Sequence, residues 1–221
     1  MGLRRRIATT VAATAAAAGM AIGLAAPATA LSESETNAFL GQLTASYNDP
    51  AVSSDGNPYD FDIVTKAALV TGADKILASQ DAFTLFAPND RAFEVLANDL
   101  GLLGKNYRFG AKVDETKVFN AIANSGVDIT EVLLYHVLPG AKVTGKQVLS
   151  GPFSQRLTMA NGEKLRVTVL SRSARFPVIV LGDKDGKFFN DLVVKSKIDV
   201  IQTDNTVVHG ISNVLLPDLQ N

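Results

Sequence analysis

The spacing of apolar residues changes at Pro139-Gly140. Before this point, apolar side chains recur at steps of three and four residues, the period of helices that bury one face. After it, apolar and polar residues alternate, as in half-buried strands. Helices followed by strands predict an α+β domain in which a helical layer covers a small sheet. No internal repeat is visible, so the pattern indicates one domain.

Capping residues indicate where the first helices begin and end. Asp60 is expected to cap a helix that Gly72 ends. A second helix follows, capped by Asn89 or Asp90. Between these two helices, residues 83–87 form a short apolar run closed by a proline, which predicts a buried strand.

Two further helices are expected before the change of period. One is centred on Phe119 and ends near Gly126. The other begins at Asp128, which is spaced from Glu131 as in a capping box, and continues until Pro139-Gly140 breaks it. These helices complete the predicted helical layer.

The predicted strands follow turn signals. Asn161-Gly162 is typical of a two-residue hairpin turn, and residues 165–169 alternate strictly between apolar and polar. A second turn is expected at residues 183–186. Further strands are expected at residues 176–181, around Ile198 and Val200, and along Val207, His209 and Ile211.

The first thirty residues have the pattern of a signal peptide. Arg4, Arg5 and Arg6 precede an alanine-rich apolar stretch that ends in Ala28-Thr29-Ala30. We therefore expect cleavage near Ala30 and a secreted, extracellular protein, exported by the general secretory or the twin-arginine route. A membrane-spanning helix is disfavoured because glycines and a proline interrupt the stretch. Residues 31–57 are expected to form an N-terminal helix and a turn-rich connector.

Composition narrows the classes of function. Without its first thirty residues the chain carries 18 basic and 22 acidic side chains, a formal charge of −4. It has no concentrated basic stripe, so nucleic acid is not an expected partner. The absence of cysteine excludes disulfides, thiol catalysis and cysteine-ligated metal. No apolar tail follows Pro217, so no membrane span is expected in the mature chain.

Three segments carry a resemblance to a known family. They are residues 84–93 (TLFAPNDRAF), 133–140 (LLYHVLPG) and 207–217 (VVHGISNVLLP). In this order they resemble the first homology box, the Tyr-His motif and the second homology box of the fasciclin family, over residues 58–217. The resemblance implies an α+β, fasciclin-like fold, with a helical layer packed on a small twisted β-sheet wedge. It also implies a non-catalytic binding or cell-adhesion module with an extracellular protein, polysaccharide or surface partner and no cofactor.

The chain departs from the family pattern at two places. Residues 102–114 make a longer connection than usual after the first box, either as a binding loop or as a tolerated surface insertion. The insertion is favoured, because each doubling of loop length costs only about 0.6 kcal/mol. Gly210 stands where a larger residue is common before the end of the final strand.

The Tyr-His motif has two interpretations. The resemblance nominates Tyr135 and His136 for partner binding, because this motif is linked to integrin recognition in animal relatives. The spacing of His136 from Val132 and Leu133 favours a core histidine instead. Such a ring donates to a backbone carbonyl and accepts from an asparagine or a hydroxyl. Both interpretations stay open at this point.

Asn89, Asp90 and His209 are assigned structural roles. A side-chain oxygen of Asn89 or Asp90 is expected to satisfy free amides at a helix start, which is worth about 1 kcal/mol. His209 shares a strand face with Val207 and Ile211, which predicts that it packs in the interior.

No residue pattern of catalysis or metal binding is found. The chain lacks G-x-S-x-G and H-E-x-x-H motifs, and its two histidines have no carboxylate at ligand spacing. Asp183, Asp185 and Gly186 do not fit a calcium loop, because the glycine comes too early and no glutamate closes it. We therefore expect no metal and no enzyme activity. The alternatives are a secreted hydrolase with a carboxylate pair and a carrier of a small apolar ligand.

Overall fold

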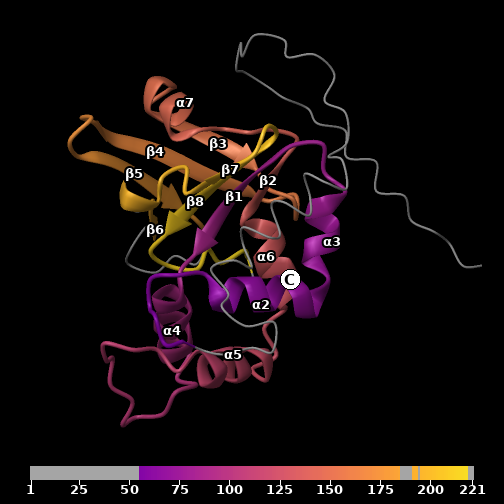
Figure 1. The fold of residues 1–221 in the computed structure, drawn as a ribbon, viewed down its shortest axis with the longest axis vertical. Coiled ribbons are helices and arrows are strands. Elements are labelled where there is room, and N and C mark those ends of the chain that lie inside the picture. Colours follow the sequence, from indigo (N-terminus) through magenta and orange to yellow (C-terminus); the bar gives the residue numbers. More distant parts are fainter. Residues whose placement is uncertain (1–54, 185–190, 194, 219–221) are drawn as a thin grey trace, which may run out of the picture.

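The chain folds into a helical layer, a central sheet and a second sheet (Figure 1). The computed structural model describes residues 55–184, 191–193 and 195–218. The expected signal peptide, the N-terminal helix and most of the connector lie outside the described residues, as does part of the expected turn at 183–186. The arrangement confirms the expected α+β class.

The helical layer is built from amphipathic segments. In the described residues its members are α2 (Asp62–Thr71), α3 (Ala73–Ala78), α4 (Asp90–Asp99), α5 (Glu115–Ala123) and α6 (Ile129–Tyr135). Gly72 ends α2 with a φ of 74°, a conformation that glycine adopts without strain. The sequence did not predict α3 or a further helix, α7 (Gly145–Ser150), because six residues are too few to show a helical period.

The start of α2 differs from the prediction. Its N-cap is Phe61, not Asp60, and no side chain of the cap accepts a hydrogen bond. The free amide of Ile63 donates instead to Oδ1 of Asp90, at 2.9 Å, from the first turn of α4. The N-cap of α4 itself is Asn89, which accepts from the amide of the third helical residue. The carboxylate of Asp90, which is distant in the sequence, therefore caps the start of α2 in place of Asp60.

The end of α6 also differs from the prediction. The helix stops at Tyr135, and β2 (Val137–Pro139) follows directly and pairs with β1 (Phe83–Pro88). The apolar run that was read as the end of a helix is therefore a strand. The capping box is only half formed: Asp128 accepts from the amide of Glu131, whereas Oε1 of Glu131 accepts from Asn161.

The central sheet has the strand order β2-β1-β8-β7. Its two middle strands, β1 and β8 (Thr206–Ile211), pair in parallel with Phe86 opposite His209. Both are buried along their whole length, because the helical layer covers one face and the second sheet the other. The edge strand β7 (Ile201–Gln202) is short, and Ile198 lies outside it, after a turn of 3₁₀-helix at Lys195–Lys197, contrary to the prediction.

The second sheet is antiparallel, with the order β3-β4-β5-β6. Its strands are β3 (Ser154–Thr158), β4 (Lys164–Arg172), β5 (Pro177–Gly182) and β6 (Asp191–Leu192). A hairpin turn that contains Asn161-Gly162 joins β3 to β4, with Gly162 at a φ of 88°. It is longer than the expected two-residue turn, because the amide of Met159 donates to the carbonyl of Glu163 and residues 160–162 lie between them. In β4, Leu165, Val167 and Val169 are buried in the core between the two sheets, as the alternation predicts, whereas Leu170 is exposed.

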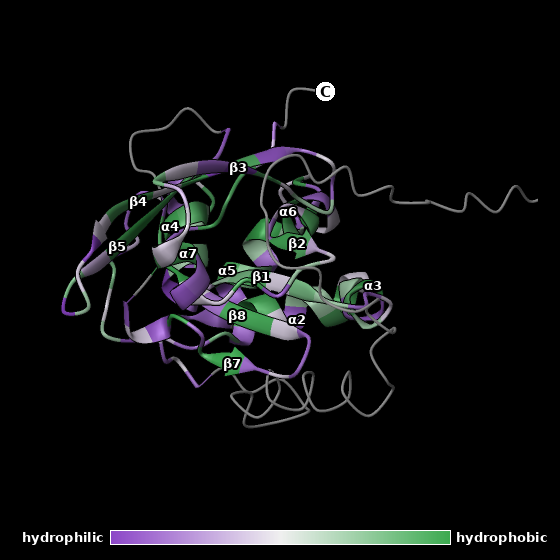
Figure 2. Cartoon of the chain, turned by 90° about the horizontal axis from the view of Figure 1, so that it is seen from above, coloured by the Kyte–Doolittle hydropathy of each residue, from purple (hydrophilic) through white to green (hydrophobic). Residues whose placement is uncertain are grey.

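Two apolar cores lie on either side of the central sheet, with hydrophobic residues along β1 and β8 (Figure 2). The departure at Gly210 has a steric reason: a Cβ there would lie 2.6 Å from Cβ of Lys197 and 3.2 Å from the Phe61 ring. No helix of the described residues is long and apolar enough to cross a bilayer.

Candidate functional site

His136 connects two of the three motif segments. It directly follows α6 and is fully buried. Its Nε2 accepts a hydrogen bond from the amide of Leu215 at 2.9 Å, so Nδ1 carries the proton and donates to the carbonyl of Val132 at 2.7 Å. The carbonyl partner is the kind that the sequence predicted. The second partner is a backbone amide, where an asparagine or hydroxyl was expected.

Burial determines the charge of His136. It lowers the pKa of the imidazole to about 4, although the hydrogen bond to Val132 acts in the opposite direction. The ring is therefore neutral at pH 7. Because both nitrogens are bonded to backbone, the ring does not act as a base toward a neighbouring hydroxyl.

Tyr135 joins the helical layer to the second sheet. Its side chain is fully buried, and its hydroxyl donates to the carbonyl of Lys164 on β4 at 3.2 Å. Burial raises the pKa of Tyr135 above its usual range. Tyr135 and His136 thus lie in the interior, and neither presents exposed surface for direct contact with a partner.

His209 has a similar environment on β8. Its Nδ1 accepts from the amide of Asp199 at 3.1 Å, so Nε2 donates to the carbonyl of Val143 at 2.8 Å. An oxygen of Asp199 also lies 3.5 Å from Nδ1, but that nitrogen has no proton with which to form an ion pair. Burial lowers the pKa of His209, and its ring packs 5.8 Å from that of Phe86. Both ring nitrogens of each histidine are therefore hydrogen-bonded to backbone groups, and the two histidines are not hydrogen-bonded to each other.

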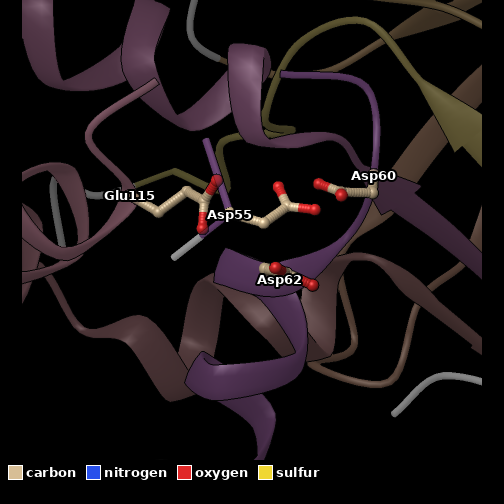
Figure 3. A group of neighbouring side chains, drawn as sticks. All are labelled: Asp55, Asp60, Asp62 and Glu115. Atoms are coloured by element: carbon tan, nitrogen blue, oxygen red, sulfur yellow. The ribbon is translucent and has the colours of Figure 1, made fainter. Parts of the chain in front are cut away.

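A group of carboxylates that the sequence analysis did not single out lies where α2 and α5 begin (Figure 3). Asp55, Asp60, Asp62 and Glu115 each contribute one oxygen, and these oxygens lie within 4.8 Å of one another. We call these four residues the acidic group. Its sequence signal is the close spacing of Asp55, Asp60 and Asp62 around the start of α2, but Glu115 comes from a distant helix and only the fold brings it there.

Asp90 adjoins the acidic group. It is fully buried, and its carboxyl group shares a hydrogen bond with that of Asp60. Burial raises the pKa of both Asp60 and Asp90. Burial, followed by the charges of Asp60, Glu115 and Asp55, raises the pKa of Asp62 to about 7.

The connection at residues 102–114 is anchored to α4. The buried carboxylate of Glu94 accepts hydrogen bonds from Arg91 and Tyr107. Arg91 also donates to the carbonyl of Gly110 at 2.6 Å, and the ring of Phe109 meets Tyr107 edge-on at 5.9 Å. Phe109 remains half exposed. The connection is thus held at several points while part of it faces solvent.

Exposed aromatic and basic side chains gather at the turn between β4 and β5. Phe153, Leu170 and Phe176 are 68%, 67% and 63% exposed. The guanidinium of Arg172 lies 4.1 Å from the centre of the Phe153 ring and donates to the carbonyl of Gly151 at 2.6 Å. Large apolar side chains exposed together commonly mark an interaction surface.

The same surface continues on the other side of the turn. Arg175 and Lys195 lie over the Phe176 ring at 5.3 and 5.5 Å, and Lys195 also donates to the carbonyl of Arg175. The surface thus combines three large apolar side chains with three positive charges. We call it the hairpin-tip patch, which consists of Phe153, Leu170, Arg172, Arg175, Phe176 and Lys195.

An apolar hollow of about 30 Å³ lies between α2, α3 and α6. Its walls include Val64, Leu77 and Leu133. Pockets that hold small molecules are usually about 300–1,000 Å³. The hollow therefore does not admit a small apolar ligand without rearrangement of its walls.

Among solved structures, a FAS1 domain pair from the insect cell adhesion molecule Fasciclin I is similar to this chain, with 17% sequence identity and a TM-score of 0.47. The match covers 68% of this chain and 43% of that chain. No curated protein matches the sequence. The model of the Fasciclin domain matches residues 60–217, which is more than half of the chain, so the chain belongs to the Fasciclin domain family of adhesion and binding modules.

Proposed function

We propose that the protein is a secreted, non-catalytic binding module whose hairpin-tip patch holds an anionic extracellular polysaccharide. The observation that carries the proposal is the pairing of exposed rings with cations at this patch, on a chain whose formal charge without its first thirty residues is −4. Phe153 and Phe176 each have a cation on the ring and remain largely exposed. Exposed rings offer apolar faces to sugars, and the cations offer charge to carboxylate or sulfate groups.

Tyr135 and His136 take part in this function as structural residues. Their hydrogen bonds join α6 to β4 and to the segment around Leu215. Tyr135 therefore holds the second sheet, which carries the hairpin-tip patch, to the helical layer, and His136 holds the segment that follows β8. A substitution of either residue is expected to act on binding through the fold.

A binding experiment with purified protein tests the proposal. Immobilised heparin serves as the sulfated polysaccharide and dextran as the neutral control. The double substitution Arg172→Ala, Phe176→Ala is expected to weaken heparin binding at least about tenfold, because it removes an exposed ring and a cation together. Binding is also expected to weaken as salt is raised.

A matched control separates the two exposed surfaces. The double substitution Arg108→Ala, Phe109→Ala removes the same residue types from the connection at residues 102–114, and it is expected to change binding by less than about twofold. Loss of binding in this variant alone moves the site to that connection. Binding of an acidic protein without binding of heparin replaces the polysaccharide by a protein partner, and turnover of any glycan contradicts the non-catalytic assignment.

Export is a separate part of the proposal and has its own test. It is supported by the basic and alanine-rich pattern of residues 1–30. Mass spectrometry of the protein collected from the culture medium is expected to find an N-terminus at Leu31. Recovery of the intact chain from cells, with none in the medium, contradicts it.

A further inference from the structure

The acidic group has the geometry of a cation's ligand sphere. Calcium binds oxygen ligands at about 2.3–2.6 Å, so two oxygens on opposite sides of the ion are about 5 Å apart. The four carboxylate oxygens of the acidic group lie within 4.8 Å of one another. They therefore fit around a single ion, and the side chains of Asp55 and Asp60 face each other across the space between them (Figure 3).

Buried oxygens at this place lack a hydrogen-bond donor among the described residues. Asp62 is only 4% exposed, and neither of its oxygens accepts a hydrogen bond from the described part of the chain. Beside it, the fully buried carboxyl group of Asp90 shares a hydrogen bond with that of Asp60. Buried carboxylates are normally paired, hydrogen-bonded or bound to metal, because leaving them bare costs several kcal/mol. The oxygens of Asp62 point to an absent ligand.

No basic side chain of the described residues supplies the missing partner. The ion pairs there join Arg91 to Glu94 and Lys184 to Glu163. Neither pair includes Asp60, Asp62 or Asp90. The charge of Asp62 is therefore balanced either by a cation from outside the described part of the chain or by a bound proton, and the experiments below distinguish the two.

The fold holds the acidic group in place from two sides. Asp60 and Asp62 flank Phe61, the N-cap of α2, and are fixed by the start of that helix. Glu115 lies in the first turn of α5, and its Oε1 accepts from the amide of Gly56 at 2.8 Å. The carbonyl of Gly56 in turn accepts from Val113 at 3.1 Å. Asp55 is therefore brought next to the buried carboxylates, and its own exposure leaves an opening to solvent.

We propose that the acidic group is a binding site for a divalent cation, with calcium as the ion that suits it. The ligands are all carboxylate oxygens, which hard cations prefer and which give the site no feature that favours zinc or copper. Calcium also accepts irregular geometry and completes its shell with water or with backbone oxygen, whereas magnesium demands a near-ideal octahedron. The ion joins the starts of α2 and α5.

Thermal unfolding of the purified full chain tests the site. The melting temperature is measured at pH 7.5 in 1 mM EDTA and in 5 mM calcium chloride. An ion that binds only the folded state stabilises it by mass action, so calcium is expected to raise the melting temperature by at least about 5 °C. Equal melting temperatures in the two buffers overturn the proposal, and the aspartates are then balanced by bound protons.

Substitutions locate the effect. Asp62→Asn keeps the shape of the side chain and removes one ligand charge, and it is expected to abolish most of the calcium-dependent rise. Asp60→Asn, at a less buried position, is expected to do the same and serves as a second variant if the first folds poorly. Asp99→Asn, on the exposed end of α4, is the matched control and is expected to keep the full rise. A full rise in both site variants overturns the proposal.

A spectroscopic probe gives a direct readout. Terbium replaces calcium in oxygen sites, and a neighbouring tyrosine sensitises its emission; Tyr59 directly precedes Asp60. Sensitised emission that calcium displaces from the wild type, and that Asp62→Asn lacks, is the expected result. Emission of equal strength in that variant places the ion elsewhere and contradicts the assignment. None of these outcomes depends on the hairpin-tip patch.

Discussion

The domain contains two buried polar centres that differ in how completely they are satisfied. At the first, each ring nitrogen of His136 and His209 has a backbone partner. At the second, Asp60 and Asp90 are bonded to each other's carboxyl group, Asp90 also to one backbone amide, and neither oxygen of Asp62 has a donor among the described residues. Burial is similar at both places, so the difference lies in the hydrogen bonds. We call the two histidines the complete centre, because all their hydrogen bonds are made within the chain and hold the fold together. We call the aspartates the incomplete centre, because a ligand from outside the described chain is needed to satisfy the oxygens of Asp62.

The surroundings of the two centres explain why both are tolerated. Each histidine has one backbone donor and one backbone acceptor; these come from α6, in the case of Val132, and otherwise from the loops at Val143, Asp199 and Leu215. Asp62, Asp90 and Glu115 lie in the first turns of α2, α4 and α5. The free amides and the dipole at a helix start stabilise negative charge by about 0.3–1 kcal/mol each. This stabilisation offsets part of the cost of burying the carboxylates but is smaller than that of a bound counter-ion.

The sharpest test of the complete centre is His136→Ala. We expect the free energy of unfolding to fall by about 4 kcal/mol, because the substitution leaves a cavity and removes the partners of the Leu215 amide and the Val132 carbonyl. Urea denaturation measures the change. His136→Gln, which keeps a polar side chain, is expected to lose less. An unchanged denaturation midpoint for the alanine variant contradicts the structural role.

Lowering the pH to 4 is expected to reduce the free energy of unfolding slightly less than the His136→Ala substitution does. In the unfolded chain His136 titrates near its usual pKa of 6.5, whereas burial lowers the folded value to about 4. Between these two pH values the imidazole is protonated in the unfolded state but not in the folded state. The free energy of unfolding is therefore highest above pH 6.5 and falls as the pH decreases. The loss is about 3 kcal/mol by pH 4, and burial of His209 acts in the same direction.

Denaturation curves measured from pH 7 to pH 4 check this dependence. The His136→Gln variant is expected to show a shallower loss than the wild type, because the group that takes up the proton is gone. Equal slopes for the two proteins over this range contradict the assignment of the acid sensitivity to His136.

The smallest expected effect comes from the incomplete centre, and it has the opposite sign. In EDTA, Asp62→Asn is expected to raise the free energy of unfolding by about 1 kcal/mol, because it removes a charge that lies next to three like charges. Its amide can also donate to neighbouring carboxylates. Chemical denaturation in EDTA measures the change. A loss of stability as large as that of His136→Ala would show that both centres are complete.

Periodicity predicted the existence of the main elements better than their ends. The alternation along residues 165–169 correctly identified β4, because one face of that strand is buried. The run Val137–Pro139 was assigned to a helix, since three apolar residues next to an amphipathic segment look the same in either state. The run is a strand because it pairs with β1, whose residues lie far away in the sequence.

The polar centres were predictable to different extents. The spacing around His136 was enough to favour a buried ring, because neighbouring apolar residues on α6 set its environment. Asp60 was expected to be a cap because the local sequence allowed it, but Asp90 from α4 fills that role. The acidic group needs Glu115, which α5 brings to α2. A local sequence pattern cannot predict that the starts of two separate helices lie next to each other in the fold.

The parallel pairing of β1 with β8 has a consequence for biosynthesis. A ribosome completes β1 early, but its central neighbour is made more than a hundred residues later. Until residues 206–211 emerge, β1 exposes an unpaired edge of apolar sequence, the kind of surface that chaperones shield and that aggregates when unprotected. The domain therefore closes only after translation has passed its last strand, and premature termination before that strand yields a chain that cannot complete its central sheet.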